Sequence, residues 1–456
     1  MSRAQSLSVA PAPLSTSGAS TALQRIATQF AAQRPQLPAL AVSEQVRAAA
    51  LAALLARGLP GARDGDWKYM DWRTLERAHF SARAGTTALP PQMCARVQAA
   101  LPTSIAGFSR QVFVDGRHEP SLSDRESGSD RIQISTAAAP SSHDAPPMSL
   151  SVSPDTRMVE LNALFLTDRT QIDVAAGAMP SSLELVFVAT QAASTGVIPS
   201  RVEVRLAADS TLELLERHIG IAEGDSFSNH VLSLDIAQNA HLQHVLLQTT
   251  AVVSQWYGSY QANLAADARF NHYGVSQGAV AARLAFRVQL DGARAMADYV
   301  TVALGTGTQI LDHQVVIEHR AANVRTRQIY RGIATGRSRV AFNGHMIVRA
   351  AATGTDVGQS LRSLIDGPGA EADARPQLEI YTDAIRASHG ATTGKLDEQM
   401  MFYLLSRGLE RDTATGLLKR AFIADAFAGL QSSVLNAAVD AVLPAALRRA
   451  TLSNNS

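Results

Sequence analysis

Apolar and polar residues alternate along much of the middle of the chain. From residue 201 to 206 charged and apolar residues alternate strictly, and Leu284, Phe286, Val288 and Leu290 alternate with polar residues in the same way. A period of two is typical of β-strands with one buried face. From about residue 183 onward, the pattern therefore predicts a β-domain.

The later predicted strands recur about every 14 residues and are separated by short turn clusters that contain glycine. Their centres lie near Phe286, Val300, Val315, Ile329 and Phe342. Many short strands at near-constant spacing fit a sandwich, a barrel or a β-solenoid. Asn-Gly and Asp-Gly pairs, the usual signals of tight hairpins, are few in this region, which favours the solenoid.

A helical pattern precedes the β-domain. Residues 45–57 are rich in Ala and Leu and are followed by Gly58 and Pro60, which are helix-stop signals. The segment from 121 to 154 is rich in Ser, Pro and Asp, and we expect it to be a linker or a long loop.

Three helices are predicted after Gly394. The first opens at Asp397 and ends at Gly408, and Thr413 is expected to cap the second. The third extends from about residue 432 to 442, and we expect Pro444 to interrupt it.

These patterns divide the chain into four parts. We expect a flexible tail rich in Ser, Ala and Pro over residues 1–43, and an N-terminal helical region with its linker over 44–155. The β core follows over 156–393, and a C-terminal helical domain over 394–450 ends the chain.

Composition narrows the classes of function. Hydrophobic residues make up 46% of the chain, which is enough for a large core and excludes disorder throughout. The net charge of +1 argues against a generally basic surface for nucleic acid. Cys94 is the single cysteine, so the chain has no internal disulfide and cannot hold an iron–sulfur cluster on its own thiolates alone.

No targeting or membrane-spanning segment stands out. The chain lacks the run of about 20 apolar residues that a membrane helix needs. Its first acidic residue is Glu44, and no apolar secretory core follows the start. We expect a cytoplasmic protein, with an organelle transit peptide as the alternative.

Familiar catalytic motifs are missing. The run from Gly390 to Leu396 resembles a phosphate loop, but its glycines are too close together and Leu396 replaces the Ser or Thr that would hold magnesium. HExxH and GxSxG motifs do not occur. No His/Cys metal cluster is predicted, because the histidines are scattered along predicted strands; His241 and His244, three residues apart, should lie on opposite faces.

Two short segments carry candidate binding residues. Trp67, Tyr69 and Trp72 are expected to anchor their segment on a core, with stacking on a ligand as the alternative. Ser388 to Thr392 is expected to be a polar turn between the last strand and the first C-terminal helix. His389 in this turn either forms a local hydrogen bond or ligates iron, and one imidazole would need ligands from a partner.

The same region carries a longer pattern. Residues 376–394 read P-x-L-E-I-x-x-D-x-I-x-x-S-H-G-A-T-x-G, and F-Y-L-x-S-R-G follows at 402–408. With weaker matches at 66–69, 114–117 and 161–165, the chain resembles the SufB/SufD family of iron–sulfur cluster assembly proteins over about residues 60–430. It is more similar to the SufD branch, because Ala387 stands where many relatives carry a cysteine.

The resemblance implies a mainly β protein with helices, namely a right-handed parallel β-helix (solenoid) core flanked by N-terminal and C-terminal helical regions. It implies a scaffold without a catalytic set, which pairs with a SufB-like paralogue through the β-helix and binds a SufC-like ATPase through its C-terminal helices. His389 matches the family histidine thought to hold the nascent iron–sulfur cluster at the SufB–SufD interface. The cluster would be transient and shared with the partner, and flavin binding in the complex stays open.

A polysaccharide lyase or hydrolase built on a β-solenoid is the alternative. Such enzymes line a groove with carboxylates and aromatic residues. Asp298, Asp312 and Glu318 are available on the central strands, whereas aromatic residues are sparse.

Overall fold

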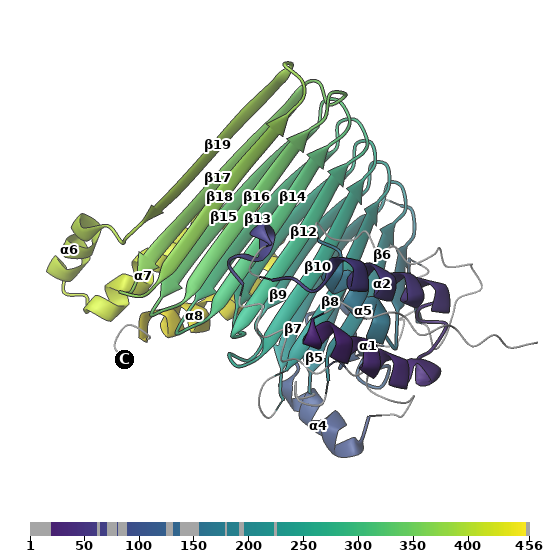
Figure 1. Ribbon diagram of the computed structural model, residues 1–456. Helices are drawn as coiled ribbons and strands as arrows, with labels where there is room; N and C mark the ends of the chain where they lie inside the picture. Colours follow the sequence, from purple (N-terminus) through teal and green to yellow (C-terminus); the bar gives the residue numbers. More distant parts are fainter. Residues whose placement is uncertain are drawn as a thin grey trace, which may run out of the picture.

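The computed structural model describes residues 20–61, 64–70, 80, 89–124, 131–136, 155–177, 180–190, 196–222 and 226–452. Its core is a parallel β-solenoid, in which successive strands alternate between two facing sheets (Figure 1). This confirms the predicted fold class and rules out a sandwich of hairpins. No helix in these ranges is both long enough and apolar enough to cross a bilayer.

The first sheet, which we call sheet A, has the order β19-β17-β15-β13-β11-β9-β7-β5-β1-β2. Its strands are parallel except for the β1–β2 pair. Their bounds are β1 (Ser109–Val114), β2 (Arg117–His118), β5 (Ser181–Ala189), β7 (Thr211–Gly220), β9 (His241–Gln248), β11 (Arg269–Gln277), β13 (Met296–Gly305), β15 (Arg325–Thr335), β17 (Thr355–Asp366) and β19 (Ile385–Gly394).

The second sheet, sheet B, has the order β18-β16-β14-β12-β10-β8-β6-β4-β3, and only its β3–β4 pair is antiparallel among the described strands. The bounds are β3 (Ile132–Thr136), β4 (Thr170–Val174), β6 (Ile198–Leu206), β8 (Phe227–Ile236), β10 (Gln255–Leu264), β12 (Ala281–Leu290), β14 (Ile310–His319), β16 (Arg339–Val348) and β18 (Glu371–Ile380). The predicted strand centres from Phe286 to Phe342 fall in β12 to β16, which confirms the spacing.

Corners with left-handed backbone connect sheet B to sheet A. Asp209, Asn239, Asp267 and Asn323 each have a φ between 57° and 60°. Asp and Asn tolerate this conformation better than most residues. Each of these backbone N–H groups donates to a carbonyl in the corner of the next coil, as Asn239 does to Ala266. The corners therefore stack the coils and replace hairpin turns.

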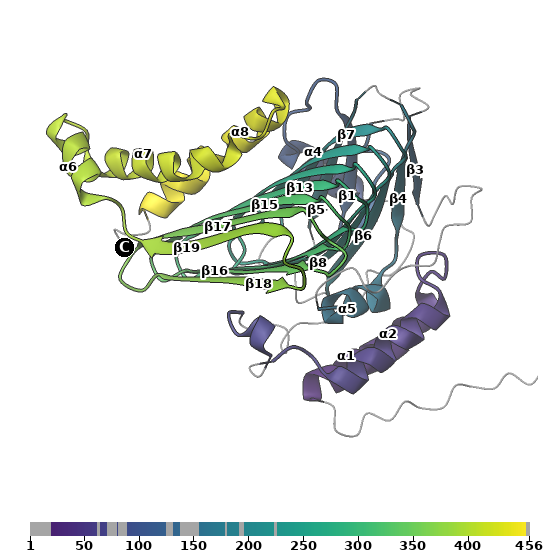
Figure 2. The ribbon, with the colours of Figure 1, turned by 90° about the horizontal axis from the view of Figure 1, so that it is seen from above.

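Helices cover both outer faces of the solenoid (Figure 2). On sheet B, α5 (Arg157–Phe165) packs against β6, β8 and β10, and α2 (Glu44–Arg57) and α1 (Thr21–Gln33) lie outside it. On sheet A, α7 (Arg411–Ala424) and α8 (Ser433–Leu452) pack over β13 and β15. Among the described residues, the other α-helices are α4 (Pro91–Ala100) and α6 (Glu398–Ser406).

Buried polar contacts fix the C-terminal helices to sheet A. Lys419 of α7 is fully buried, forms an ion pair with Asp366 of β17 at 2.6 Å and donates to the carbonyl of Ala450 in α8. Arg449 of α8 donates to Gln277 of β11. The α7–α8 pair is therefore part of the folded body.

Several local predictions are wrong. Residues 21–33 form α1, with Leu23, Ile26 and Phe30 buried, so this part of the expected tail is ordered helix; residues 1–19 lie outside the described ranges. Strands β1 and β3 occur where helix and linker were expected, although most of 121–154 is outside the described ranges. The solenoid sheets thus begin before residue 156, while the domain division itself stays a prediction.

The predictions of individual helices are partly confirmed and partly wrong. The α2 and α6 predictions are confirmed, with Ser43 and Asp397 as side-chain caps. Thr413 lies inside α7 and does not cap it. Helix α8 continues through Pro444, because the apolar residues on both sides of the proline, Leu443 and Leu447 among them, are buried against sheet A. That burial offsets the one backbone hydrogen bond that proline removes.

Candidate functional site

The last coil of the solenoid contains the predicted site residue. His389 lies on β19, opposite Gln359 of β17, and its side chain is exposed. The expected turn at 388–392 is therefore wrong. These residues belong to strand β19, which forms backbone hydrogen bonds with one side of β17. Nothing in the described ranges pairs with the other side of β19, which leaves an open sheet edge.

Partly covered apolar residues surround this edge. Ala372, Ala374 and Leu378 of β18 and Ile385 of β19 pack against the core but remain partly exposed. In earlier coils the next coil buries the equivalent positions. The terminal coil therefore offers both unpaired backbone groups and apolar side chains to a partner.

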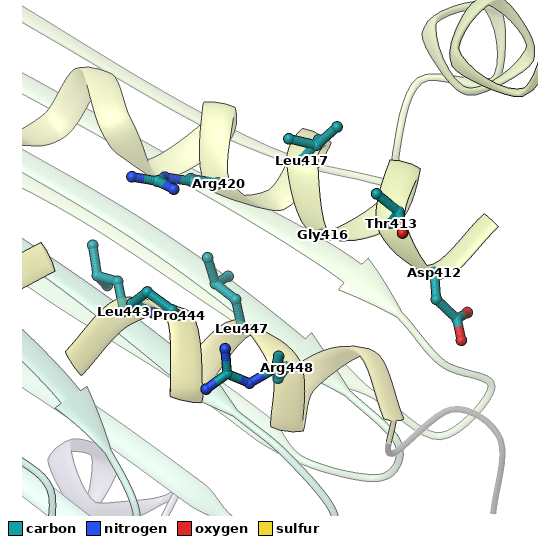
Figure 3. Close-up of a pocket in the computed structure, with 9 residues that line it drawn as sticks. All are labelled: Asp412, Thr413, Gly416, Leu417, Arg420, Leu443, Pro444, Leu447 and Arg448. Carbon is teal, nitrogen blue, oxygen red and sulfur yellow. The ribbon is translucent and has the colours of Figure 1, made fainter. Parts of the chain in front are cut away.

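The C-terminal helices form a second exposed feature. A groove of about 400 Å³ lies between α7 and α8 (Figure 3). Its lining combines an apolar floor with charged ends, and consists of Asp412, Thr413, Gly416, Leu417, Arg420, Leu443, Pro444, Leu447 and Arg448. The neighbouring helix α6 buries none of its residues, and its Met400, Phe402 and Tyr403 are all more than half exposed.

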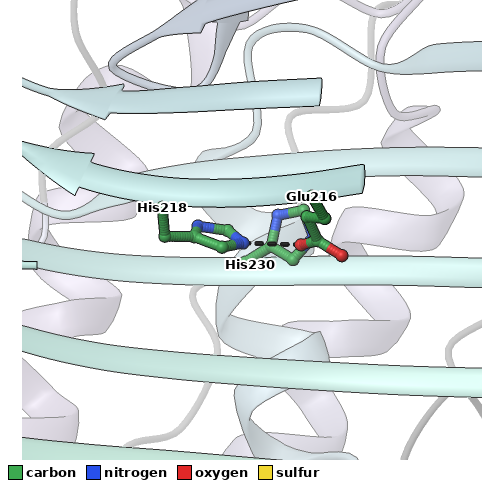
Figure 4. Close-up of side chains that lie close together, drawn as sticks. All are labelled: Glu216, His218 and His230. Carbon is green, nitrogen blue, oxygen red and sulfur yellow. Dashed lines mark hydrogen bonds and ion pairs between the residues drawn. The ribbon is translucent and has the colours of Figure 1, made fainter. Parts of the chain in front are cut away.

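A third feature was not predicted from the sequence. Glu216 and His218 of β7 meet His230 of β8 inside the solenoid (Figure 4), a grouping that the sequence analysis did not predict. One ligand atom from each lies within 4.8 Å of the others, and all three side chains are buried. Of the described residues, only these three form such a group, and His389 is not part of it.

Neighbouring strands extend this cluster. Nε2 of His244 lies 3.0 Å from Oε2 of Glu216, and the hydroxyl of Tyr260 donates to Oε1 at 2.7 Å. His272 continues the row, with its Nδ1 3.1 Å from Nδ1 of His244. His241 and His244 both lie on β9, and their odd spacing on this strand confirms that they lie on opposite faces.

Burial and the contacts within this cluster shift the pKa values of His218 and Glu216. It lowers the pKa of His218 to about 4, against the opposing effect of Glu216. Burial also disfavours the ionised form of Glu216, but interactions with His230, His218 and His244 outweigh it and hold the pKa of this carboxyl well below its ordinary value. The carboxylate is therefore ionised and His218 is neutral at pH 7.

The N-terminal aromatic segment has a structural role at Trp67. This side chain is buried, its indole N–H donates to Asp155, and the guanidinium of Arg283 lies 4.1 Å from the centre of its ring. These contacts confirm an anchor at this position. Tyr69 is only partly buried, and Trp72 lies outside the described ranges.

The carboxylates considered for polysaccharide chemistry are all held in ion pairs. Asp312 pairs with Arg283 in the interior, Glu318 with Arg320 and Arg349, and Asp298 with Arg327. No observation on these residues favours the alternative of a lyase or hydrolase. Cys94, on α4, is partly buried and belongs to none of the features above.

Comparison with known proteins gives a consistent result. Residues 187–422 match the family model described as "SUF system FeS cluster assembly, SufBD core domain". The chain is 30% identical to the iron–sulfur cluster assembly protein SufD of Escherichia coli, over 82% of this chain and 86% of that protein. It is 25% identical to a SufBD family protein of Synechocystis, over 81% and 83% of the two chains. A chloroplastic protein of Arabidopsis thaliana is 29% identical over about half of each chain.

Proposed function

Because the chain belongs to the SufB/SufD family of iron–sulfur cluster assembly proteins, we propose that it is the SufD-like scaffold subunit of a SufBCD-type complex. In this role it has no catalytic set of its own, and ATP hydrolysis belongs to a partner. The nascent iron–sulfur cluster is cargo that it shares with the SufB-like subunit.

The observation that carries this proposal is the open edge at β19. An exposed strand with unpaired backbone groups is a template for a strand from another chain. A SufB-like paralogue would present a solenoid end of the same kind, so two terminal coils can extend each other's sheets and cover Leu378 and Ile385. His389 would then lie at the junction.

His389 offers one imidazole to iron at that junction. Histidine replaces cysteine as an iron ligand in some clusters, so the residue type is suitable. Within the described part of the chain His389 belongs to no group of three or more possible metal ligands. The partner would therefore supply the remaining ligands, including every thiolate, because Cys94 is far along the chain on α4.

The C-terminal helices are the proposed dock for the SufC-like ATPase. Helix α6 exposes three large apolar side chains, and the α7–α8 groove adjoins it with an apolar floor. Monomeric proteins seldom leave such surfaces uncovered. The proposed location is the cytoplasm, with an organelle as the alternative because two similar proteins of Arabidopsis thaliana are named chloroplastic.

A co-purification experiment tests both interfaces. The full chain is produced with SufB-like and SufC-like proteins, and complexes are isolated by affinity and size-exclusion chromatography. Phe402→Asp should abolish binding of the ATPase but retain the SufB-like subunit, because Phe402 is 73% exposed on α6 and contributes little to the fold. Val252→Asp is the matched control, since Val252 is 52% exposed but lies in the loop after β9.

Retention of the ATPase by Phe402→Asp, and also by a chain that lacks residues 398–456, would disprove the docking site. A wild-type chain that binds neither partner would disprove the scaffold proposal itself.

A further inference from the structure

The proposed scaffold role makes no use of the polar cluster inside the solenoid. Glu216 and His218 alternate along β7 with their side chains directed inward, in line with Leu212 and Leu214 of the core. His230 reaches them from β8 in the facing sheet. A carboxylate in such an apolar interior is costly unless hydrogen bonds and a counter-charge compensate it.

The hydrogen bonds to Glu216 can be assigned one by one. Oε1 accepts from Nε2 of His218 at 2.5 Å and from the hydroxyl of Tyr260 at 2.7 Å. Oε2 accepts from Nε2 of His244 at 3.0 Å. A carboxylate oxygen has two lone pairs, so Oε1 is already fully used by these two donors.

His230 lies beside the same carboxylate oxygen. Its Nδ1 lies 2.7 Å from the hydroxyl of Ser200, which fixes the ring. Its Nε2 lies 3.0 Å from Oε1 of Glu216, yet makes no hydrogen bond within the described residues, although the side chain is fully buried. The ring therefore holds Nε2 beside the carboxylate oxygen, where the two atoms can bind the same cation.

We propose that Glu216, His218 and His230 bind one divalent first-row transition-metal ion of the Fe²⁺ or Zn²⁺ class inside the solenoid. Two imidazoles and one carboxylate are a recurrent ligand set for both ions. Metal–ligand bonds of about 2.0–2.1 Å place neighbouring ligand atoms roughly 3.3 Å apart in a tetrahedral site. The two separations from Oε1 of Glu216, 2.5 and 3.0 Å, need to widen by less than 1 Å, and the two imidazole nitrogens lie within 4.8 Å of each other. His218 then holds its proton at Nδ1 instead of Nε2.

The surroundings fit such an ion. Ser200 orients His230, and Tyr260 and His244 orient Glu216, which are the contacts that usually position metal ligands from outside. A cavity of about 10 Å³ beside His218, lined also by Ser200 and Thr250, has room for about one water molecule. Nitrogen ligands favour transition metals over Mg²⁺ and Ca²⁺.

Burial predicts how the ion enters. All three ligand side chains are buried, so we expect the metal to bind as the chain folds and to exchange slowly with solvent afterwards. The inference does not depend on the scaffold proposal, because the site lies in the interior and uses none of the interface residues.

The test measures metal in the full chain expressed with added Zn²⁺ or, without oxygen, Fe²⁺. After treatment with EDTA, mass spectrometry should find about one equivalent per chain, which guanidinium releases on unfolding. Refolding with Co²⁺ should give a visible ligand-field absorption, and refolding with Mg²⁺ should leave no bound ion. Less than about a tenth of an equivalent after EDTA would overturn the proposal.

Matched variants locate the metal. Glu216→Gln and His230→Gln should each lower the metal content at least about tenfold. His313→Gln is the control, because His313 is also buried in the solenoid but contacts Ser276 and Thr301, and it should retain the metal. His389→Ala should retain it too, and loss of the metal in that variant would instead place the ion at the exposed edge. Should the Gln variants fail to fold, the measurements on the wild-type chain decide the question.

Discussion

Buried charges at single positions are held by partners on neighbouring coils. Glu318 at the end of β14 is almost fully buried, and Arg320 and Arg349 contact its two oxygens at 2.9 Å and 2.7 Å. Burial opposes ionisation here, but these two guanidinium groups outweigh it and lower the pKa of Glu318 to about 2. The ion pair thus joins β14 to the loop after β16.

This low pKa predicts a pH-dependent contribution to stability. Because the pKa of Glu318 is about 2 in the folded state and has an ordinary value of 4.5, the contribution is complete above pH 4.5 and is lost as the pH falls toward 2. Glu318→Gln should lower the free energy of unfolding at pH 7, and the gap to wild type should narrow below pH 4.5. Urea unfolding at a series of pH values measures this gap, and a gap that stays constant down to pH 2 would contradict the prediction.

Replacing His389 is predicted to change the iron–sulfur cluster content of the complex and not the stability of the chain. The side chain is exposed on β19, so His389→Ala should leave the fold and complex formation unchanged. Loss of one iron ligand should lower the cluster content of the reconstituted complex by about tenfold. Iron and sulfide analysis measures the content. His345→Ala, which removes a partly exposed histidine on β16, is the control, and an unchanged cluster content in His389→Ala would refute the role.

Between elements, one buried arginine joins two helices on sheet B. Arg47 of α2 donates to the carbonyls of Ala163 and Leu164 at 2.8 Å and 2.7 Å, and to that of Leu166 at 2.9 Å. These are among the last carbonyls of α5, which have no partner within their own helix. A cation also interacts favourably with the negative end of the helix dipole.

Arg47→Met should therefore destabilise the protein. It keeps the volume of the side chain but leaves buried carbonyls without donors, at a cost of about 2–4 kcal/mol in the free energy of unfolding. Arg34→Met is the control, because the pair of Arg34 with Glu44 is largely exposed and should contribute no more than about 1 kcal/mol. Equal losses for both variants in chemical denaturation would contradict the special role of Arg47.

Elements repeated along the solenoid could be predicted from the sequence, whereas its two ends could not. Each inner strand must alternate, because it packs on the core on one side, and this made β12 to β16 recognisable. Strand β19 has no coil after it, so Ser388 to Thr392 carry no apolar alternation and resemble a turn. Strand β3 is short and pairs antiparallel with β4, outside the regular repeat.

The buried cluster was missed for a different reason. Glu216 and His230 lie on different sheets, and their separation along the chain matches no known metal motif. The available signal was the alternation along each strand, since Glu216, His218 and His230 occupy inward positions in line with apolar core residues such as Leu212, Leu214, Leu232 and Leu234. A charged residue at such a position requires compensation, and this requirement identifies it as unusual.

At the scale of the whole molecule, the two ends of the solenoid differ in how their last strands are covered. Antiparallel strands terminate the first end, where β2 pairs with β1 and β3 pairs with β4. The other end, formed by β18 and β19, has no such cover in the described ranges. Natural proteins protect exposed strand edges when no partner binds there, often with lysine. The described part of β19 contains no lysine.

Introducing lysine at this edge should block the proposed pairing with the SufB-like subunit. The double variant Ala391→Lys, Thr393→Lys places two charges on exposed positions of β19, so the thermal unfolding temperature should change little. Pairing should weaken at least about tenfold, because a new strand at the edge would bury these charges. Size-exclusion chromatography with light scattering measures the complex. Ala208→Lys, in the exposed corner between β6 and β7, should pair normally, and normal pairing by the double variant would show that the partner binds elsewhere.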